Sequence, residues 1–145
     1  MARDLFTEAE QKQIVEAIKQ AEKNTSGEIR VHIEKTCKED VLDHAAYMFD
    51  ALEMQKTELR NGVLIYLAVE DRKLAILGDA GINQKVPVNF WEDVKNIMVE
   101  NFKKGDFAKG LSDGIIKAGE QLKQHFPYQK DDTNELSDDI SFGNN

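Results

Sequence analysis

The pattern of hydrophobic and polar positions predicts three β-strands. Over residues 28–34 the two kinds alternate strictly, which is typical of a strand with one dry face and one polar face. Residues 63–69 are apolar or aromatic without a break, which is typical of a central strand covered on both faces. Charged residues 70–73 interrupt this run and residues 74–77 resume it. We therefore expect a hairpin that returns the third strand antiparallel to the second.

Apolar residues at helical spacing predict four helices around these strands. Thr7 with Glu10, and Asn89 with Glu92, have the capping-box spacing that satisfies free amides at a helix start. Asp106 is a further candidate cap, and the glycines of the last helix would let it approach the sheet closely. The helices are expected within residues 7–23, 41–52, 89–104 and 106–122.

The order of these elements predicts an α/β fold. A strand–helix–strand unit forms a right-handed crossover with parallel strands, and the hairpin adds an antiparallel strand to the same sheet. The expected architecture is a three-layer α/β/α sandwich with a small mixed, twisted sheet and helices on both faces. Residues 1–128 form one domain, and residues 129–145 form an acidic, loosely ordered tail that Ile140 and Phe142 could anchor.

The charge, the apolar content and the cysteine count of the chain limit the partners and the location that we expect. The 145 residues include 19 Lys and Arg against 27 Asp and Glu, a net charge of -8 that disfavours nucleic acid. No apolar run is long enough to cross a membrane, and the first residues lack the pattern of a secretory signal, so we expect a cytoplasmic monomer. The single cysteine, Cys37, excludes an internal disulfide and a cysteine-based zinc site.

Three polar residues are expected at one end of the sheet, here called the Glu28 end. Glu28 begins the first strand, Asn61 directly precedes the second, and Asp79 follows the third. Carboxylate and amide oxygens are the ligands that Ca²⁺ and Mg²⁺ prefer, so this end is a candidate metal site. The alternative is an ion pair between Arg60 and a carboxylate, with Asn61 as a turn residue.

Other candidates carry weaker signals. Asp106 would be a further metal ligand if its helix began beside the Glu28 end. Glu34, Glu70 and Asp71 are expected at the opposite end, here called the hairpin end, where solvated charges are common. The three histidines have no spacing typical of a metal motif, and His32 is expected to pack under a helix.

Several short motifs occur in the order found in one known family. They include Ser26-Gly27-Glu28 before the alternating strand and Arg60-Asn61-Gly62 before the apolar strand. Asp71-Arg72 at the hairpin, Asp79 to Ile82 after the third strand, Trp91, and Gly105 to Gly110 complete the series. Over about residues 5–127 the chain resembles the TPM domain family.

The resemblance implies a four-stranded twisted sheet, with the extra strand at residues 83–88 or in the tail. It also implies calcium binding and acid phosphatase activity, since some members are described so, and many members are exported or membrane-anchored. Many members read Gly-x-Gly-Leu-Glu after the third strand. Asp79 stands here at the first glycine of that motif and Asn83 at the glutamate.

Three functions follow as hypotheses. The first is a domain that binds Ca²⁺ or Mg²⁺ through Glu28, Asn61 and Asp79, with weak or no phosphatase activity. The second is a metal-assisted acid phosphatase, in which Arg60 binds the substrate and stabilises charge that develops on the phosphate. The third is a non-catalytic module for protein interaction or quality control.

Overall fold

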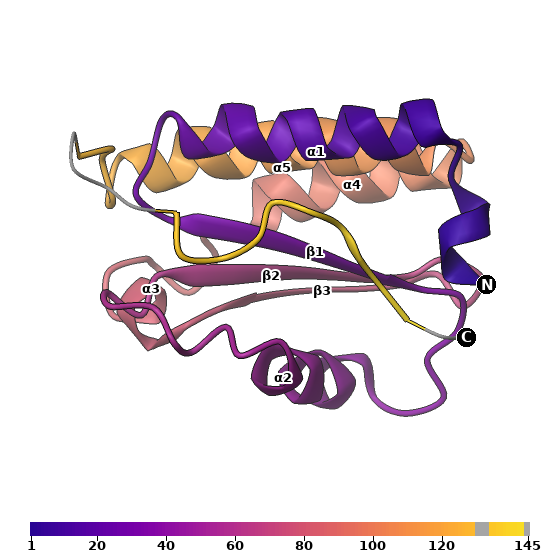
Figure 1. Cartoon of the computed structure of the whole chain (residues 1–145), viewed down its shortest axis with the longest axis horizontal. Coiled ribbons are helices and arrows are strands. Elements are labelled where there is room, and N and C mark those ends of the chain that lie inside the picture. Colours follow the sequence, from indigo (N-terminus) through magenta and orange to yellow (C-terminus); the bar gives the residue numbers. More distant parts are fainter. Residues whose placement is uncertain (130–133, 144–145) are drawn as a thin grey trace.

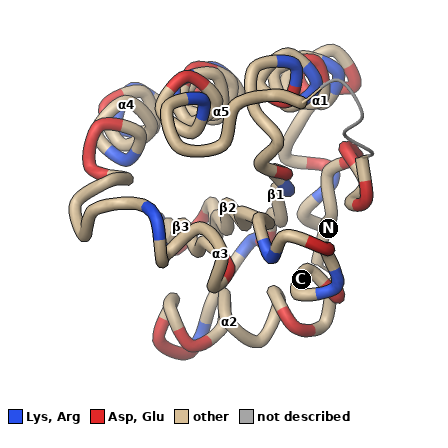
Figure 2. Tube along the Cα trace, turned by 90° about the vertical axis from the view of Figure 1, so that its left-hand side faces the viewer, with Lys and Arg blue, Asp and Glu red and all other residues tan. Residues whose placement is uncertain are grey.

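The computed structural model describes residues 1–129 and 134–143, which form three layers (Figure 1). Three helices cover one face of the sheet: α1 (Glu8–Glu22), α4 (Glu92–Lys103) and α5 (Phe107–Lys123). The other face carries α2 (Val41–Ala51), and Figure 2 shows the sheet between the two helical layers. The 3₁₀-helix η1 (Ala2–Leu5) and the short helix α3 (Ala80–Asn83) complete the helical elements of the described residues. The α/β sandwich predicted from the sequence is confirmed.

The sheet contains β1 (Glu28–Glu34), β2 (Gly62–Ala68), β3 (Lys73–Gly78) and β4 (Ser141–Phe142), in the order β3-β2-β1-β4. β1 and β2 are parallel, and β2 and β3 are antiparallel, as the sequence predicts. β4 pairs in parallel with β1, so the extra strand comes from the tail. Residues 83–88 hold the end of α3 and turns, so the other position considered for the extra strand is wrong.

Two of the three predicted helix caps form. The Thr7 side chain accepts a hydrogen bond from the Glu10 amide, and the Glu10 carboxylate accepts one from the Thr7 amide. Asp106 likewise accepts from the Lys109 amide. Asn89 is not the cap, because successive turns after Pro87 delay the start of α4 to Glu92, which makes Trp91 the N-cap residue.

The sheet separates two hydrophobic cores. Alternate residues of β1 and β2, such as Val31 and Ile65, join the larger core under α1, α4 and α5. The other residues of β2, including Leu64 and Tyr66, pack in a smaller core against α2. All of β2 is buried, as expected for a central strand.

The glycines of α5 permit close packing between helices. A Cβ atom at Gly119 would lie 2.7 Å from the Cβ of Ala21 in α1, and one at Gly114 would lie 2.5 Å from Met98 in α4. Such distances are too short for non-bonded carbon atoms. The expectation of a close approach to the sheet was wrong, because these glycines face the neighbouring helices.

The tail follows the free side of β1 over its described part (Figure 1). Ile140 and Phe142 pack against the larger core, which is the anchoring that the sequence left open. Leu136 is buried in the smaller core. The expected loose tail also includes residues 130–133 and 144–145, which lie outside the described residues.

Candidate functional site

Backbone hydrogen bonds bring the three predicted site residues to one end of the sheet. The Glu28 amide donates to the Asn61 carbonyl at 3.0 Å, and the Asp79 amide donates to the Gly62 carbonyl at 2.9 Å. Parallel pairing sets Glu28 beside Gly62, and antiparallel pairing returns β3 to the same end. All three side chains are buried there, with at most 5% of each residue exposed.

Asp79 is held by two partners. Its carboxylate accepts two hydrogen bonds from the Arg60 guanidinium, at 2.7 Å from Nε and 2.8 Å from Nη2. It also caps α3 by accepting from the Ala80 amide at 2.7 Å. The hydrogen bond with Asp79 raises the pKa of Arg60, whose side chain remains 50% exposed. The ion pair that the sequence analysis kept as an alternative is therefore present.

Gly81 explains why Arg60 lies beside Asp79. A Cβ atom at Gly81 would lie 2.2 Å from the Leu59 carbonyl oxygen, so any larger residue would push the two segments apart. The Gly81 amide instead donates to the Arg60 carbonyl at 2.9 Å. Arg60 also has a positive φ of 50°, which turns the chain sharply before β2.

Only the nitrogen of the Asn61 side-chain amide has a hydrogen-bond partner among the described residues. Its Nδ2 donates to the Ser26 carbonyl at 2.6 Å. Its Oδ1 is buried and has no hydrogen-bond partner among the described residues. Burying a carbonyl oxygen without a hydrogen-bond partner costs folding free energy. This oxygen atom is therefore available to accept from, or to coordinate, a ligand.

Glu28 is joined to the tail rather than to Asp79. Its Oε1 accepts from the Glu135 amide at 2.6 Å and from the Leu136 amide at 2.7 Å. Burial raises the pKa of the Glu28 carboxyl, and these two hydrogen bonds partly oppose the effect. The contacts depend on residues more than a hundred positions away, which the sequence pattern could not reveal.

The structure adds two acidic residues that sequence reasoning missed. Glu22, at the end of α1, accepts from the Ile29 amide at 2.9 Å and lies against Asp138 of the tail. Burial, and then the hydrogen bond with Asp138, raise the pKa of Glu22 to about 9. Two carboxyl groups in contact must share a proton or a cation, so this pair extends the acidic character of the Glu28 end.

Asp106 does not belong to this end. The chain after α5 returns to the start of β1, where the Ser26 amide donates to the Phe126 carbonyl. The first residue of α5, Phe107, lies instead beside Leu67 and Leu74 at the hairpin end. The condition under which Asp106 would be a further metal ligand is therefore not met, because α5 begins at the opposite end of the sheet.

The side chains of the Glu28 end carry oxygen atoms of the kinds that bind hard cations. Within residues 1–129 and 134–143, no three His, Cys, Asp or Glu side chains are placed to hold one metal ion. Magnesium and calcium sites also use amide oxygens, backbone carbonyls and water, with as few as one or two carboxylates. Glu28, Asn61 and Asp79 have oxygen atoms of these kinds, but the Glu28 carboxylate is bonded to the tail and the Asp79 carboxylate to Arg60.

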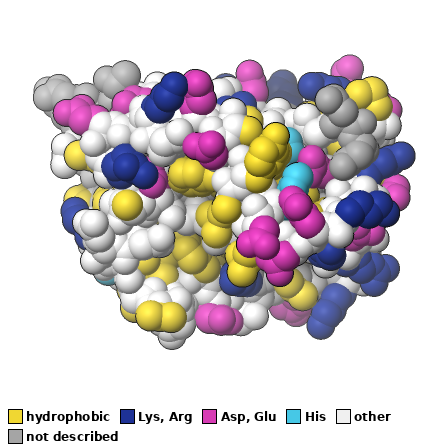
Figure 3. Space-filling model, turned by 90° about the horizontal axis from the view of Figure 1, so that it is seen from below, with side chains coloured by type: hydrophobic (Ala, Val, Ile, Leu, Met, Phe, Trp, Pro, Cys, Tyr) yellow, Lys and Arg dark blue, Asp and Glu magenta, His cyan; other side chains and the backbone are white. Residues whose placement is uncertain are grey.

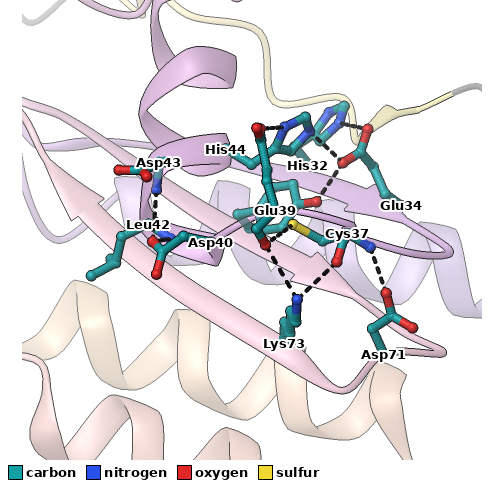
Figure 4. A network of polar contacts seen from close by, with 11 residues as sticks. His32, Glu34, Cys37, Glu39, Asp40, Leu42, Asp43, His44, Asp71 and Lys73 are labelled. Carbon is teal, nitrogen blue, oxygen red and sulfur yellow. Dashed lines mark hydrogen bonds and ion pairs between the residues drawn. The ribbon is translucent and has the colours of Figure 1, made fainter.

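A second polar network lies at the hairpin end (Figure 4). Glu34 accepts a hydrogen bond from Tyr66 and contacts His44 Nε2 at 2.8 Å, while the other ring nitrogen of His44 contacts Glu39. The buried His32 stacks on Tyr66, and desolvation lowers its pKa. The alternation of β1 places His32 and Glu34 on one face, but His44 comes from α2, so only the fold reveals the network.

The side chains of this network are mainly shielded from solvent. Figure 3 shows the α2 face, where histidine reaches the surface among hydrophobic and acidic side chains. Only 22% of the His44 side chain is exposed, and His32 and Glu34 are buried. Cys37 is also buried, and its amide donates to Asp71. The network therefore connects β1, β2 and α2 and offers a substrate little access.

These features define an α/β domain with buried polar groups at the Glu28 end of a mixed sheet. In its described part, no helix is long and apolar enough to cross a membrane. The model of the TPM domain family matches residues 2–121, and the chain belongs to that family. The comparison with curated proteins found no match.

Solved structures share this fold. The BA42 protein of the psychrophilic bacterium Bizionia argentinensis is 54% identical, with a TM-score of 0.91 and 95% of each chain covered. The N-terminal domain of a P. gingivalis protein is 17% identical, with a TM-score of 0.69 and coverage of 86% of this chain and 82% of that one. The N-terminal domain of the cg2496 protein of Corynebacterium glutamicum is 13% identical, with a TM-score of 0.65 and coverage of 97% and 81%. The last two similarities concern the fold alone.

Proposed function

We propose that this TPM domain binds a divalent cation, Ca²⁺ or Mg²⁺, at the Glu28 end of its sheet. The carrying observation is the buried Oδ1 atom of Asn61, which has no partner among the described residues. Asn61 stands directly before β2, whose first residue pairs with Glu28 and accepts from the Asp79 amide. An amide oxygen and two buried carboxylates at the same end of the sheet are hard-oxygen donors of the kind that these ions prefer.

Arg60 is the cation that a metal ion would have to replace. It occupies both oxygens of Asp79, but half of its side chain is exposed, so it can move into solvent without opening the core. A divalent ion would supply the positive charge that Arg60 now supplies. The proposal therefore makes Arg60 a competitor for the site rather than a ligand.

The phosphatase hypothesis gains nothing from this arrangement. Without a bound cation, its proposed phosphate-binding group, Arg60, is paired with Asp79. The only cysteine, Cys37, is buried at the hairpin end. A divalent cation would supply charge neutralisation at the Glu28 end, and the residues of that end would bind and orient it.

The test is an amide-shift titration of the full chain with CaCl₂ and MgCl₂. We expect shifts confined to residues 26–30, 60–62 and 78–83. Asp79→Asn, which keeps an oxygen to cap α3, should weaken binding at least tenfold, about 1.4 kcal/mol. Arg60→Ala should tighten binding, because it removes the competing positive charge from Asp79.

The matched control is Asp43→Asn, an exposed aspartate at the start of α2. It should leave the cation affinity unchanged. A titration in which neither ion shifts the three segments would refute the proposal. Shifts centred on Glu34 and Asp71 would refute it as well, because they would locate the cation at the hairpin end.

A further inference from the structure

A cavity of about 250 Å³ lies at the hairpin end, far from the proposed cation site. Its walls come from two layers of the fold, because strands β2 and β3 of the sheet meet the corner between α4 and α5 there. The apolar walls are Leu67, Leu74, Val99, Phe102 and Phe107. Among the residues that the structure describes, no carboxylate lines it.

The aromatic wall of the cavity is held in place. Phe102 and Phe107 stack with their ring centres 5.1 Å apart and an angle of 26° between the rings. A Cβ atom at Gly110 would lie 2.7 Å from Phe102 Cε1, so the ring rests directly on the backbone of α5. Because the rings are fixed from behind, the cavity does not require them to move before a ligand enters.

Two cations stand at the rim. Arg72 lies in the β2–β3 turn with a φ of 53°, and Lys103 ends α4. Both are exposed, and neither forms an ion pair with the described part of the chain. The neighbouring Asp71 is engaged elsewhere, since its Oδ2 accepts from the Cys37 amide. Two positive charges without an ion pair among the described residues therefore flank an apolar cavity, in a chain whose net charge is -8.

The geometry points to a binding site for a small apolar carboxylate, such as a medium-chain fatty acid. The hydrocarbon part would fill the space between the leucines and the two phenylalanines. The carboxylate would remain at the rim and accept from the Arg72 guanidinium, which can donate two parallel hydrogen bonds, with Lys103 as a second positive charge. The volume lies just below the range typical of drug-sized ligands, which favours a single chain or ring over a larger cofactor.

The site is independent of the proposed function. Leu67 is the next-to-last residue of β2, whereas the cation site lies before its first residue. EDTA in the buffer removes any contribution of divalent ions to the measurement. Failure of one proposal therefore leaves the other untouched.

The experiment titrates the full chain with sodium octanoate below its micelle concentration and follows backbone amide and side-chain methyl shifts. We expect shifts at Leu67, Leu74 and Val99. Octan-1-ol, which has the same chain without the charge, should bind at least tenfold more weakly. The double variant Arg72→Asn/Lys103→Gln should also weaken octanoate binding at least tenfold, and asparagine suits the positive φ of the turn.

Lys104→Gln is the matched control, because Lys104 is the next residue and is exposed but does not line the cavity. It should bind octanoate like the unaltered chain. Equal binding of octanol and octanoate, or an unchanged affinity in the double variant, would show unspecific apolar association and overturn the proposal. Methyl shifts outside the cavity, or none at all, would overturn it too.

Discussion

At the scale of single residues, the Glu28 end is distinguished by how its polar atoms are satisfied. The Asp79 carboxylate accepts hydrogen bonds from Arg60 and from the first amide of α3, and the Glu28 carboxylate accepts from two amides of the tail. The side-chain oxygen of Asn61 has no partner in the described residues. Residue type alone did not separate these roles. Because Asn61 Oδ1 is buried without a hydrogen-bond partner, it is the atom of the Glu28 end that is most available to a ligand.

Glu22 makes the stability of the protein depend on pH. The folded chain keeps its proton up to a pKa of about 9, whereas the ordinary value is 4.5. The folded state therefore binds more protons between these pH values, and the free energy of unfolding falls as the pH rises through this window. Glu22→Gln mimics the protonated carboxyl, so we expect a flatter pH profile and a gain of at least about 1.4 kcal/mol at pH 8, the equivalent of one pKa unit.

Chemical denaturation in EDTA at several pH values measures this effect. Glu16→Gln, at an exposed position of the same helix, should leave the slope of the profile unchanged. An unaltered slope in Glu22→Gln would mean that Glu22 is ionised in the folded protein.

At the scale of elements, the packing of α5 depends on the absence of side chains. Gly119 faces Ala21 so closely that a methyl group has no room. Gly119→Ala should lower the free energy of unfolding by about 1–2 kcal/mol, because overpacking outweighs the better helix propensity of alanine. Glu120→Ala, at the exposed next position of α5, should change it by less than about 0.5 kcal/mol. Equal effects in thermal or urea unfolding would contradict this packing argument.

The tail is a second element whose role can be measured. Leu136 is 9% exposed in the smaller core, and its amide donates to Glu28. Leu136→Ala should lower the free energy of unfolding by about 2 kcal/mol, near the lower limit for a buried leucine. Leu59→Ala is the control, since Leu59 is 52% exposed. Two equally stable variants would show that the tail contributes no packing energy.

At the scale of the whole molecule, the two ends of the sheet differ in chemistry. The Glu28 end collects carboxylates and an unpartnered amide oxygen, whereas the hairpin end holds an apolar cavity with two cations at its rim. The parallel β1–β2 pair and the β2–β3 hairpin separate these groups by the length of β2. One small domain can therefore present two unlike surfaces.

The same arrangement predicts poor phosphatase activity. Turnover of p-nitrophenyl phosphate should remain far below about ten per second, a typical enzyme rate, with Ca²⁺ or Mg²⁺ present. The reason is that Asn83 stands where many members of the family have a glutamate, and the cysteine of the chain, Cys37, is buried at the hairpin end. Turnover at an ordinary rate that disappears in Arg60→Ala would reverse this conclusion and favour the phosphatase hypothesis.

The sequence alone predicted the local structure and the topology of the central sheet well. Strict alternation located β1, an unbroken apolar run located β2, and the hairpin turn set the direction of β3. These signals are local, because they depend on side-chain period and turn chemistry within a few residues. Topology then sufficed to place Glu28, Asn61 and Asp79 at one end.

The tertiary structure decided which partner each polar group has. Contacts across long stretches of the chain joined Glu28 to the tail, Glu22 to Asp138, and His44 to Glu34. It also moved Asp106 to the opposite end, since the direction of α5 depends on how its glycines pack against α1 and α4. Sequence period can say which face a residue occupies. Only packing in three dimensions determines what that face meets, and therefore whether a buried oxygen is satisfied or available to a ligand.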